Sequence, residues 1–316
     1  MLYPLLFYPI YKEMIWGGNR MAERFGRILP SDHTGESWDI SCRPNEMGVV
    51  ENGPLAGLAF DKVISQNPNA FLGNRVYSSY KKKGFPLLVK IIDANDDLSV
   101  QVHPDDVYAI HHGFENGKSE MWYVMEAPPG QSLIIGLTDD ATPKRLREDP
   151  MSCLYKLPVK KGDIINIPAG LVHAITKGVM IAEIQQNSDI TYRLYDYNRI
   201  DLNGKPRELH LKDGLTVADF DNRYPQDTIT GVTLVQENTR ITRAVVNPYF
   251  AVIKYEIDGE FSETSDPETF ATFTCVEGSC TISGVELNCS RSAFIPAGLG
   301  TYDIKGKAVL LKSFVP

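Results

Sequence analysis

The amino-acid sequence predicts a mainly β fold of the sandwich or barrel type, built as two β-units with short helical inserts. Short runs of four to eight residues, rich in Val, Ile, Leu and aromatic side chains, recur along the chain between Gly, Pro or Asp residues. The five residues from Ile167 to Leu171 also recur unchanged from Ile295 to Leu299. This repeat indicates that one β-unit has been duplicated.

The length of the chain fits such an organisation. Its 316 residues, of which 43% are hydrophobic, suffice for about two domains of ordinary size with buried cores. In the first unit we expect strands over six runs: 85–92, 98–104, 120–126, 131–137, 163–168 and 179–186. In the second unit the corresponding runs are 250–257, 270–278, 278–284 and 308–315.

Helical patterns are fewer and lie between the strands. One covers 105–114, and another covers 142–149, where Thr142 is a plausible N-cap and Pro143 takes the first helical position. The polar stretch 201–239 contains turn signals at Asn203-Gly204 and Pro206, so we interpret it as the connection between the two units.

Charge and cysteine content restrict the class of protein. The formal net charge of −8 provides no basic surface for a polyanion, so we expect no nucleic-acid partner. The apolar start of the chain contains prolines and reaches Lys12 and Glu13 before the roughly 18 apolar residues that a membrane span requires. We therefore expect neither a signal peptide nor a membrane partner. Five cysteines without a CxxC pair indicate a reduced, cytoplasmic protein.

A histidine follows the repeated turn in the first unit alone. The pattern there is Gly162-x5-Pro168-x-Gly170-x2-His173, which is typical of a strand that enters a tight turn at the mouth of a barrel. In the second unit the equivalent place is occupied by Thr301. Only the first unit therefore keeps a ligand of the kind that metals bind.

Further candidate ligands lie upstream of this turn. Ser99, Gln101 and His103 alternate with valines, so a strand would place these three polar groups on one face. Lys118 and Glu120 repeat the same spacing at the start of an apolar run.

Gln101, His103, Glu120 and His173 together supply one amide oxygen, two imidazoles and one carboxylate, a set that suits one Zn²⁺ or a similar divalent ion. Each residue also has an ordinary interpretation as a hydrogen-bonded core group or a solvated strand face, and only their conjunction favours a metal site. His111 and His112 belong to an expected exposed helix, and we assign no role to His33 or His210.

At these residues the chain resembles the type I mannose-6-phosphate isomerase family, metal-dependent enzymes built on the cupin fold. The resemblance extends over most of the chain. Its motifs are Trp16-Gly17-Gly18, Glu36-Ser37-Trp38, Asn52-Gly53-x-Leu55, FPLLVKII, SVQVHPDD, KSEMWYV, IPAGLVHA, and Glu183 followed by NSDITYR.

The resemblance implies two cupin (jelly-roll β-barrel) units with short helical inserts. Residues 1–239 would form a catalytic metal-binding domain with an N-terminal extension and a linker, and 240–316 a degenerate domain without metal ligands. The four candidate ligands match the metal ligands of the family, and Arg193 matches its catalytic arginine. The family's longer members carry a run of the form YxDxNHKPE, of which this chain keeps only Asn116, Lys118 and Glu120. The large helical domain of those members would also be missing.

The reaction implied by the resemblance is the interconversion of mannose 6-phosphate and fructose 6-phosphate through a cis-enediol. It requires an electrophile, a base that moves a proton between C2 and C1, and cations for the phosphate. Arg193 would stabilise the enediolate or bind the phosphate. Lys90, in the middle of an apolar run, and Ser99 are candidates for phosphate binding. Glu183 is a candidate base, and Lys118 competes for that role.

Two other functions remain open at this point. A cupin metal site can serve an oxygenase, although a Gln ligand with Lys90 and Arg193 nearby favours an anionic sugar over O₂. A non-catalytic sugar-phosphate sensor would keep the cations but would not need the metal and the base.

Overall fold

The computed structural model describes residues 2–201, 204–221, 229–236 and 238–316, which divide into two compact units. Unit 1 contains Met1–Ile10, Ser37–Ile91 and Thr230–Pro316, and unit 2 contains Tyr11–Glu36 and Ile92–Ile229. The domains predicted from the sequence, 1–239 and 240–316, were continuous stretches, whereas each unit is assembled from separate segments. The chain passes from one unit to the other within β2 (Ile10–Gly18), β3 (Thr34–Ile40) and β7 (Leu87–Asp93).

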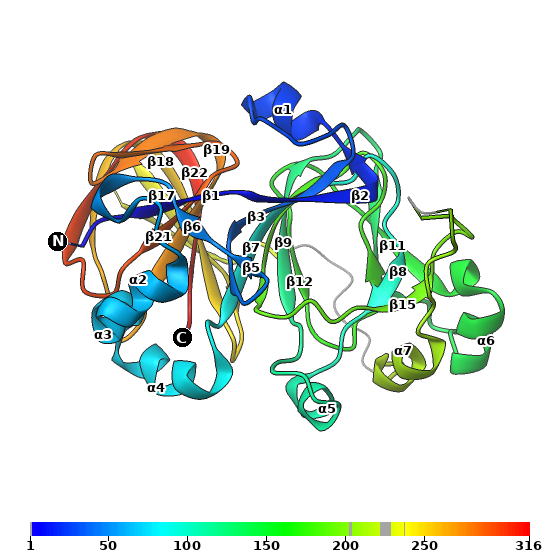
Figure 1. The fold of residues 1–316 in the computed structure, drawn as a ribbon. Coiled ribbons are helices and arrows are strands. Elements are labelled where there is room, and N and C mark those ends of the chain that lie inside the picture. The colour runs from blue at the N-terminus through cyan, green and yellow to red at the C-terminus, as the bar shows by residue number, and fades with distance from the viewer. Residues whose placement is uncertain (1, 202–203, 222–228, 237) are drawn as a thin grey trace. The chain divides into compact units, whose positions relative to one another are not determined.

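Unit 2 contains two packed layers of antiparallel strands (Figure 1). One layer has the order β11 (Leu154–Pro158), β10 (Ser132–Leu137), β13 (His173–Ala174), β8 (Val100–Val102) and β15 (Tyr192–Tyr195). In the other, β9 (Glu120–Glu126) lies between β12 (Ile164–Ile167) and β14 (Met180–Gln186). Side chains of both layers, including Trp122, Leu133, Ile135, Ile165 and Ile181, share one buried core. This sandwich is the jelly-roll type of barrel expected from the short strands.

A second core covers the opposite face of the five-stranded layer. It contains Val100, Val102, Tyr192 and Leu194, together with apolar side chains of α6 (Pro143–Glu148) and α7 (Leu211–Val217). Figure 1 shows both helices beside this layer. Because successive side chains of a strand point to opposite faces, Gln101 and Arg193 must face the interior of the sandwich.

Unit 1 is built on a nine-stranded sheet that wraps around its own core. The strand order is β16 (Val232–Gln236), β17 (Thr239–Val246), β18 (Ala251–Thr264), β22 (Thr301–Phe314), β19 (Ala271–Ile282), β21 (Ser292–Ile295), β1 (Leu5–Tyr8) and β6 (Val49–Val50), with β20 (Val285–Asn288) paired to β19. A short hairpin, β4 (Cys42–Arg43) and β5 (Glu46–Met47), stands apart from it.

Three short helices pack in the same unit: α2 (Phe60–Gln66), α3 (Pro68–Leu72) and α4 (Asn74–Lys83). Figure 1 shows them grouped on one side of the unit. Phe60 of α2 contacts Phe7, Phe85 and Phe294 edge to face, with ring centroids 4.7 to 5.2 Å apart. This buried aromatic cluster joins the helices to the sheet.

The structure confirms the mainly β fold and most of the expected elements. The side chain of Thr142 caps α6 by accepting a hydrogen bond from the N–H of Arg145, as the sequence predicted. The helix expected over 105–114 is α5 (Asp106–His111). A six-residue helix, α1 (Arg20–Phe25), precedes the first expected strands.

Some elements differ from the prediction. The stretch 201–239, interpreted as a simple connection, contains α7 and β16, although 202–203, 222–228 and 237 lie outside the described residues. The strands expected over 270–278 and 278–284 form one strand, β19, with a register shift between Cys275 and Glu277. The sequence analysis also missed α2 to α4. Asn67-Pro68 and Gly73 divide this region into helices of 5 to 10 residues, too short for a clear apolar period.

Two other findings bear on the protein class. Among the described residues, no helix is both long and apolar enough to span a bilayer. All five cysteines are free thiols, three of them buried.

Candidate metal centre

Three candidate residues form one row across the five-stranded layer of unit 2. Arg193 of β15 lies opposite Gln101 of β8, and Gln101 lies opposite His173 of β13. Directly opposite residues of an antiparallel sheet share a face, so all three side chains point into the sandwich. His103 follows β8, two residues beyond Gln101, as the predicted alternation requires.

The facing layer contributes a carboxylate to the same place. Glu120 begins β9, and its side chain is fully buried. One ligand atom each from His103, Glu120 and His173 lie within 4.8 Å of one another. The amide Nε2 of Gln101 lies 3.3 Å from Nε2 of His173. The structure therefore brings together the four residues that the sequence proposed as ligands.

Both histidines are oriented by backbone carbonyl groups. Nδ1 of His103 lies 2.7 Å from the carbonyl oxygen of Ile190, and Nδ1 of His173 lies 2.8 Å from that of Leu171. A carbonyl oxygen can only accept, so each Nδ1 carries the hydrogen and each Nε2 keeps a lone pair for a metal. Burial lowers the pKa of both imidazoles, to about 3 for His103, which keeps them in the neutral form that binds metals.

Lys118 supplies a positive charge next to the carboxylate. Its ammonium Nζ lies 2.5 Å from Oε1 of Glu120 and 3.2 Å from Nε2 of His103. Burial acts to raise the pKa of Glu120, but the positive charge of Lys118 acts against burial, and this pKa lies well below its usual value. The site therefore offers an ionised carboxylate and two neutral imidazoles, a donor set that fits a divalent ion such as Zn²⁺.

Sequence reasoning missed Trp122, although it shares a strand face with Glu120. The indole Nε1–H points at two carboxylates, Oε2 of Glu120 at 3.1 Å and Oε1 of Glu183 at 3.0 Å. Its ring also meets the ring of His173 edge to face, with centroids 5.3 Å apart. The two-residue spacing from Glu120 to Trp122 could have shown that their side chains share a face of β9. Nothing in the sequence showed that β14 would place Glu183 opposite Trp122.

Arg193 is half-buried, and its backbone and side chain are held by the segment that follows β15. Its Nη1–H donates to the carbonyl oxygen of Glu208 at 2.7 Å. Its backbone N–H donates to Nδ1 of His210 at 3.2 Å, and its carbonyl oxygen accepts from the N–H of His210 at 2.8 Å. Burial and the guanidinium of Arg207 lower the pKa of Arg193 from its usual value. His210, which had no role in the sequence analysis, thus binds a candidate catalytic residue.

The remaining two candidates are less directly connected to this centre. Ser99 is buried immediately before β8 in unit 2. Lys90 is buried in the part of β7 that belongs to unit 1, with its ammonium 4.8 Å from the ring centroid of Trp38. Phosphate binding by these residues stays a prediction.

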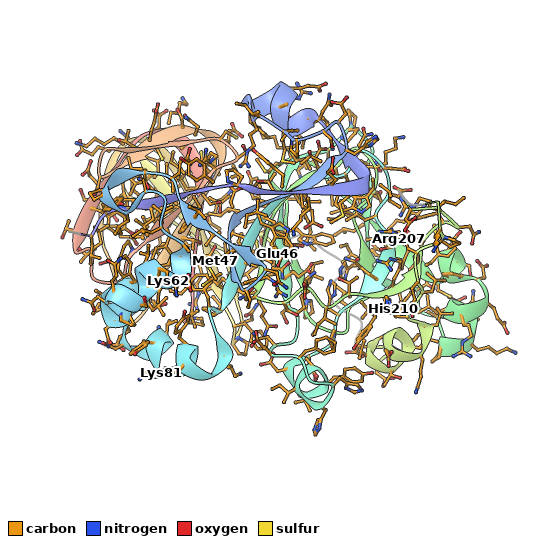
Figure 2. The ribbon with its side chains drawn as sticks, viewed as in Figure 1. Glu46, Met47, Lys62, Lys81, Arg207 and His210 are labelled. Atoms are coloured by element: carbon orange, nitrogen blue, oxygen red, sulfur yellow. The ribbon has the colours of Figure 1, made fainter. Side chains whose placement is uncertain are left out.

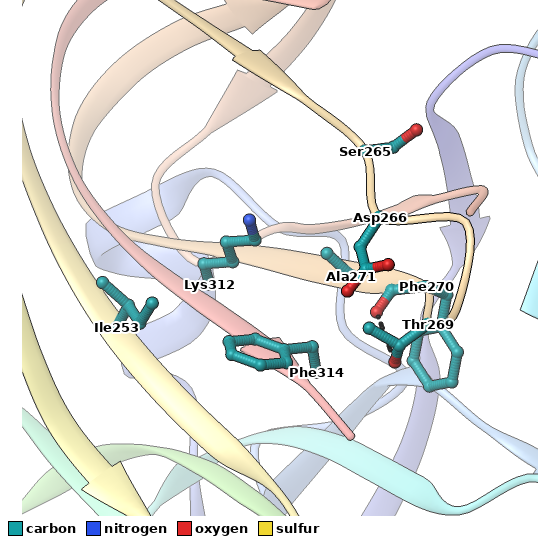
Figure 3. Close-up of a pocket in the computed structure, with 8 residues that line it drawn as sticks. All are labelled: Ile253, Ser265, Asp266, Thr269, Phe270, Ala271, Lys312 and Phe314. Atoms are coloured by element: carbon teal, nitrogen blue, oxygen red, sulfur yellow. Dashed lines mark hydrogen bonds between the residues drawn. The ribbon is translucent and has the colours of Figure 1, made fainter. Parts of the chain in front are cut away.

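The corresponding turn of unit 1 has no such centre. Thr301 begins β22 there, and among the described residues the group of His103, Glu120 and His173 is the one cluster of potential metal ligands. A cavity of about 130 Å³ in unit 1 is lined by the eight residues of Figure 3, among them Ile253, Ala271 and Phe314. The ammonium of Lys312 at this cavity pairs with Glu263 at 2.6 Å.

Comparison with known proteins identifies relatives along the whole chain. Residues 5–125 match the family model of the catalytic domain of type I phosphomannose isomerase, and residues 240–315 match that of the mannose-6-phosphate isomerase cupin domain. A probable mannose-6-phosphate isomerase of Bacillus subtilis (strain 168) is 36% identical over 97% of each chain. A mannose-6-phosphate isomerase of Streptococcus mutans is 37% identical over 98% of each chain.

A solved structure agrees with these relatives. The crystal structure of the mannose 6-phosphate isomerase from Bacillus subtilis superimposes with a TM-score of 0.88 at 34% identity, covering 98% of this chain and 99% of that one. The cupin fold expected from the sequence is thereby confirmed.

The metal centre predicts the metal content of variants. We expect one divalent ion per chain in the wild-type protein, and none in His103→Ala or His173→Ala, because each change removes a buried imidazole ligand. Elemental analysis with circular dichroism checks this, and His111→Ala, an exposed histidine on α5, is the control that should keep its ion. Two ions per wild-type chain, or full retention of metal in both variants, would contradict it.

Proposed function

Because this chain belongs to the type I phosphomannose isomerase family, we propose that it interconverts mannose 6-phosphate and fructose 6-phosphate at the metal centre of unit 2. One observation carries this proposal: His103, Glu120 and His173 form one buried group inside the barrel, and His173 of this group shares a cross-strand row with Gln101 and Arg193. Metal ligands and a permanent cation on the inner face of one barrel suit an isomerase that stabilises an enediolate.

We propose one Zn²⁺ per chain, held by Nε2 of both histidines, the carboxylate of Glu120 and the amide oxygen of Gln101. A half-turn of the Gln101 amide would bring Oε1 to the place of the Nε2 that now lies beside His173. When bound, the ion polarises the carbonyl of the sugar and stabilises negative charge on its oxygen. With a single carboxylate among the ligands, the centre keeps a net charge of about +1 for this purpose.

Lys118 or Glu183 would transfer the proton between C2 and C1 of the sugar. Lys118 contacts Glu120 directly, whereas Glu183 contacts the indole of Trp122, which also donates to Glu120. This difference in contact supports Lys118 as the group that meets the substrate, with Glu183 holding Trp122 and thereby Glu120. That interpretation reverses the order of the two candidates suggested by the sequence.

Arg193 remains charged throughout the working pH range and would bind the enediolate or the phosphate. Lys90 and Ser99 remain the candidates for the phosphate. The substrate is then a small anionic sugar. The five free thiols support the prediction of a reducing, cytoplasmic setting.

The isomerase assignment predicts metal-dependent turnover. Zinc-loaded protein should convert mannose 6-phosphate to fructose 6-phosphate in a coupled assay, lose this activity with a chelator, and regain it with added Zn²⁺. A loaded protein without turnover would rule out the isomerase and leave a sugar-phosphate sensor or an oxygenase. Full activity after removal of the metal, verified by elemental analysis, would contradict the role of the ion.

Arg193 and Lys90 are expected to differ in the kinetic constant they affect. Arg193→Ala should lower kcat by at least about 10²-fold with unchanged zinc content, as for loss of one preorganised transition-state donor. Lys90→Ala should mainly raise KM because it weakens ground-state phosphate binding. Steady-state kinetics measure both, with Arg147→Ala, an exposed arginine of α6, as the control. An unchanged kcat in Arg193→Ala would show that Arg193 is not a catalytic residue.

The two candidate bases can be distinguished by exchange of the substrate's C2 proton with solvent. Lys118→Met should abolish this exchange, because it removes the group that can carry the proton. Glu183→Gln should retain exchange, since its amide can still accept the hydrogen bond from Trp122. Proton NMR in D₂O follows the exchange. The opposite pattern, with exchange lost only in Glu183→Gln, would make Glu183 the base.

A further inference from the structure

A cluster of charged side chains follows β15 in unit 2, and the roles proposed above do not use it. Its centre is Asp196, whose exposed fraction is only 4%. Oδ1 of Asp196 accepts from Nη2 of Arg199 at 2.6 Å, and both carboxylate oxygens accept from Arg207. One buried carboxylate thus binds two guanidinium groups.

The contact with Arg207 has a two-point geometry that fixes orientation. Nε of Arg207 donates to Oδ2 of Asp196 at 2.7 Å, and its Nη2 donates to Oδ1 at 2.5 Å. A paired contact of this kind holds the guanidinium in one plane, which a lysine ammonium cannot do. The ion pair closes the loop that leaves β15 at Asp196 and returns at Arg207.

The residues that follow Arg207 contact Arg193. The residue next to Arg207 is Glu208, whose carbonyl oxygen accepts from Nη1 of Arg193 at 2.7 Å. Two residues later, His210 exchanges two hydrogen bonds with the backbone of Arg193. Arg207 and His210, both labelled in Figure 2, therefore mark the two ends of a four-residue segment that lies along Arg193.

The backbone of the turn after Asp196 has an unfavourable conformation that the contacts of Asp196 and Arg199 can stabilise. Tyr197 and Asn198 both have a left-handed backbone, with φ of 56° and 54°. Two consecutive non-glycine residues in this region are energetically unfavourable and persist only where surrounding contacts hold them. Arg199 contributes by stacking over the ring of Tyr197 at 5.1 Å and by donating to the carbonyl oxygen of Asp97.

The cluster also balances the charge around Arg193. Arg199 and Arg207 both act to lower the pKa of Arg193, whereas Asp196 acts to raise it. Asp196 is itself kept ionised, because the hydrogen bonds from Arg207 and Arg199 outweigh burial and lower its pKa. Loss of the carboxylate would leave three guanidinium groups without this counter-charge.

We propose that Asp196 is a positioning residue for the isomerase reaction: its paired contact with Arg207 places the Glu208 carbonyl, which in turn holds the guanidinium of Arg193, a residue in register with Gln101 and His173. This inference rests on the proposed function. Asp196 acts through Arg193 and does not itself meet the substrate.

The first test is Asp196→Asn in the zinc-loaded protein. Displacement of a catalytic group by about 1 Å can cost on the order of 10²-fold, so kcat should fall about 10- to 100-fold, with KM and zinc content nearly unchanged. Phenylglyoxal labelling of Arg193, read by peptide mapping, should become faster because its guanidinium loses a fixed partner.

A matched control is Asp163→Asn. Asp163 is another mostly buried carboxylate of unit 2 at the base of a turn, where it accepts from the backbone N–H of Lys160 at 2.9 Å and from its ammonium at 3.0 Å. Its loss should lower the melting temperature but leave kcat and the labelling of Arg193 as in the wild type. A merely structural role for Asp196 would give the same result as this control, and that result would overturn the proposal.

The second test is a double-mutant cycle. In the Arg193→Ala background, Asp196→Asn should change kcat by less than about twofold, because residues that act through one another are not additive. A further 10-fold or larger loss in that background would show an independent role for Asp196 and contradict the proposal.

Arg207→Lys covers the case in which Asp196→Asn does not fold. It keeps the charge but loses the two-point contact, so kcat should fall in the same direction, and a wild-type kcat would overturn the proposal. Failure of the proposed function is recognised separately, because the wild-type protein would then show no isomerase turnover in the same assay.

Discussion

A completely buried, ionised carboxylate is the constraint on which the centre of unit 2 depends. Removing the Glu120 carboxylate from water is tolerated only with close cationic or metal partners, and Lys118 lies 2.5 Å away. The two imidazoles around it are kept neutral by the same burial. A dication bound between these groups would be coordinated by one negatively charged carboxylate and two imidazole lone pairs at a buried place, where electrostatic attraction is strong.

The side chains that touch this group are themselves held by a surrounding layer. Backbone carbonyl groups orient the two histidines, and Trp122 links Glu120 to Glu183. Arg193 is held through the segment after β15, which the Asp196 ion pairs close. Leu171 and Trp122 orient His173 and Glu120 from nearby positions in the sequence, whereas Ile190 and Glu183 come from distant segments. The barrel must therefore form before the whole centre has its geometry.

The two units share one turn sequence but differ in the residue that follows it. Both contain the turn sequence Ile-Pro-Ala-Gly-Leu, but His173 follows it in unit 2 and Thr301 in unit 1. In the interior of unit 1 the polar groups bind one another: the phenols of Tyr255 and Tyr302 donate to Glu263, and Lys312 pairs with the same carboxylate. These contacts give Tyr255, Tyr302 and Lys312 a shared partner in Glu263.

The sequence by itself determined the fold class and predicted the candidate ligand set. Gln101 and His103 alternate with valines, and His173 follows a tight turn. Both patterns are local, and the alternation of side chains along a strand decides which face of the sheet they occupy. The tertiary structure alone decided which groups from distant segments meet them. Trp122 meets Glu183 because of the pairing of β9 with β14, and His210 and Glu208 contact Arg193 because the segment after Arg207 lies along β15. Register and loop closure depend on the whole barrel, because a strand carries no local signal for the residue that lies opposite it.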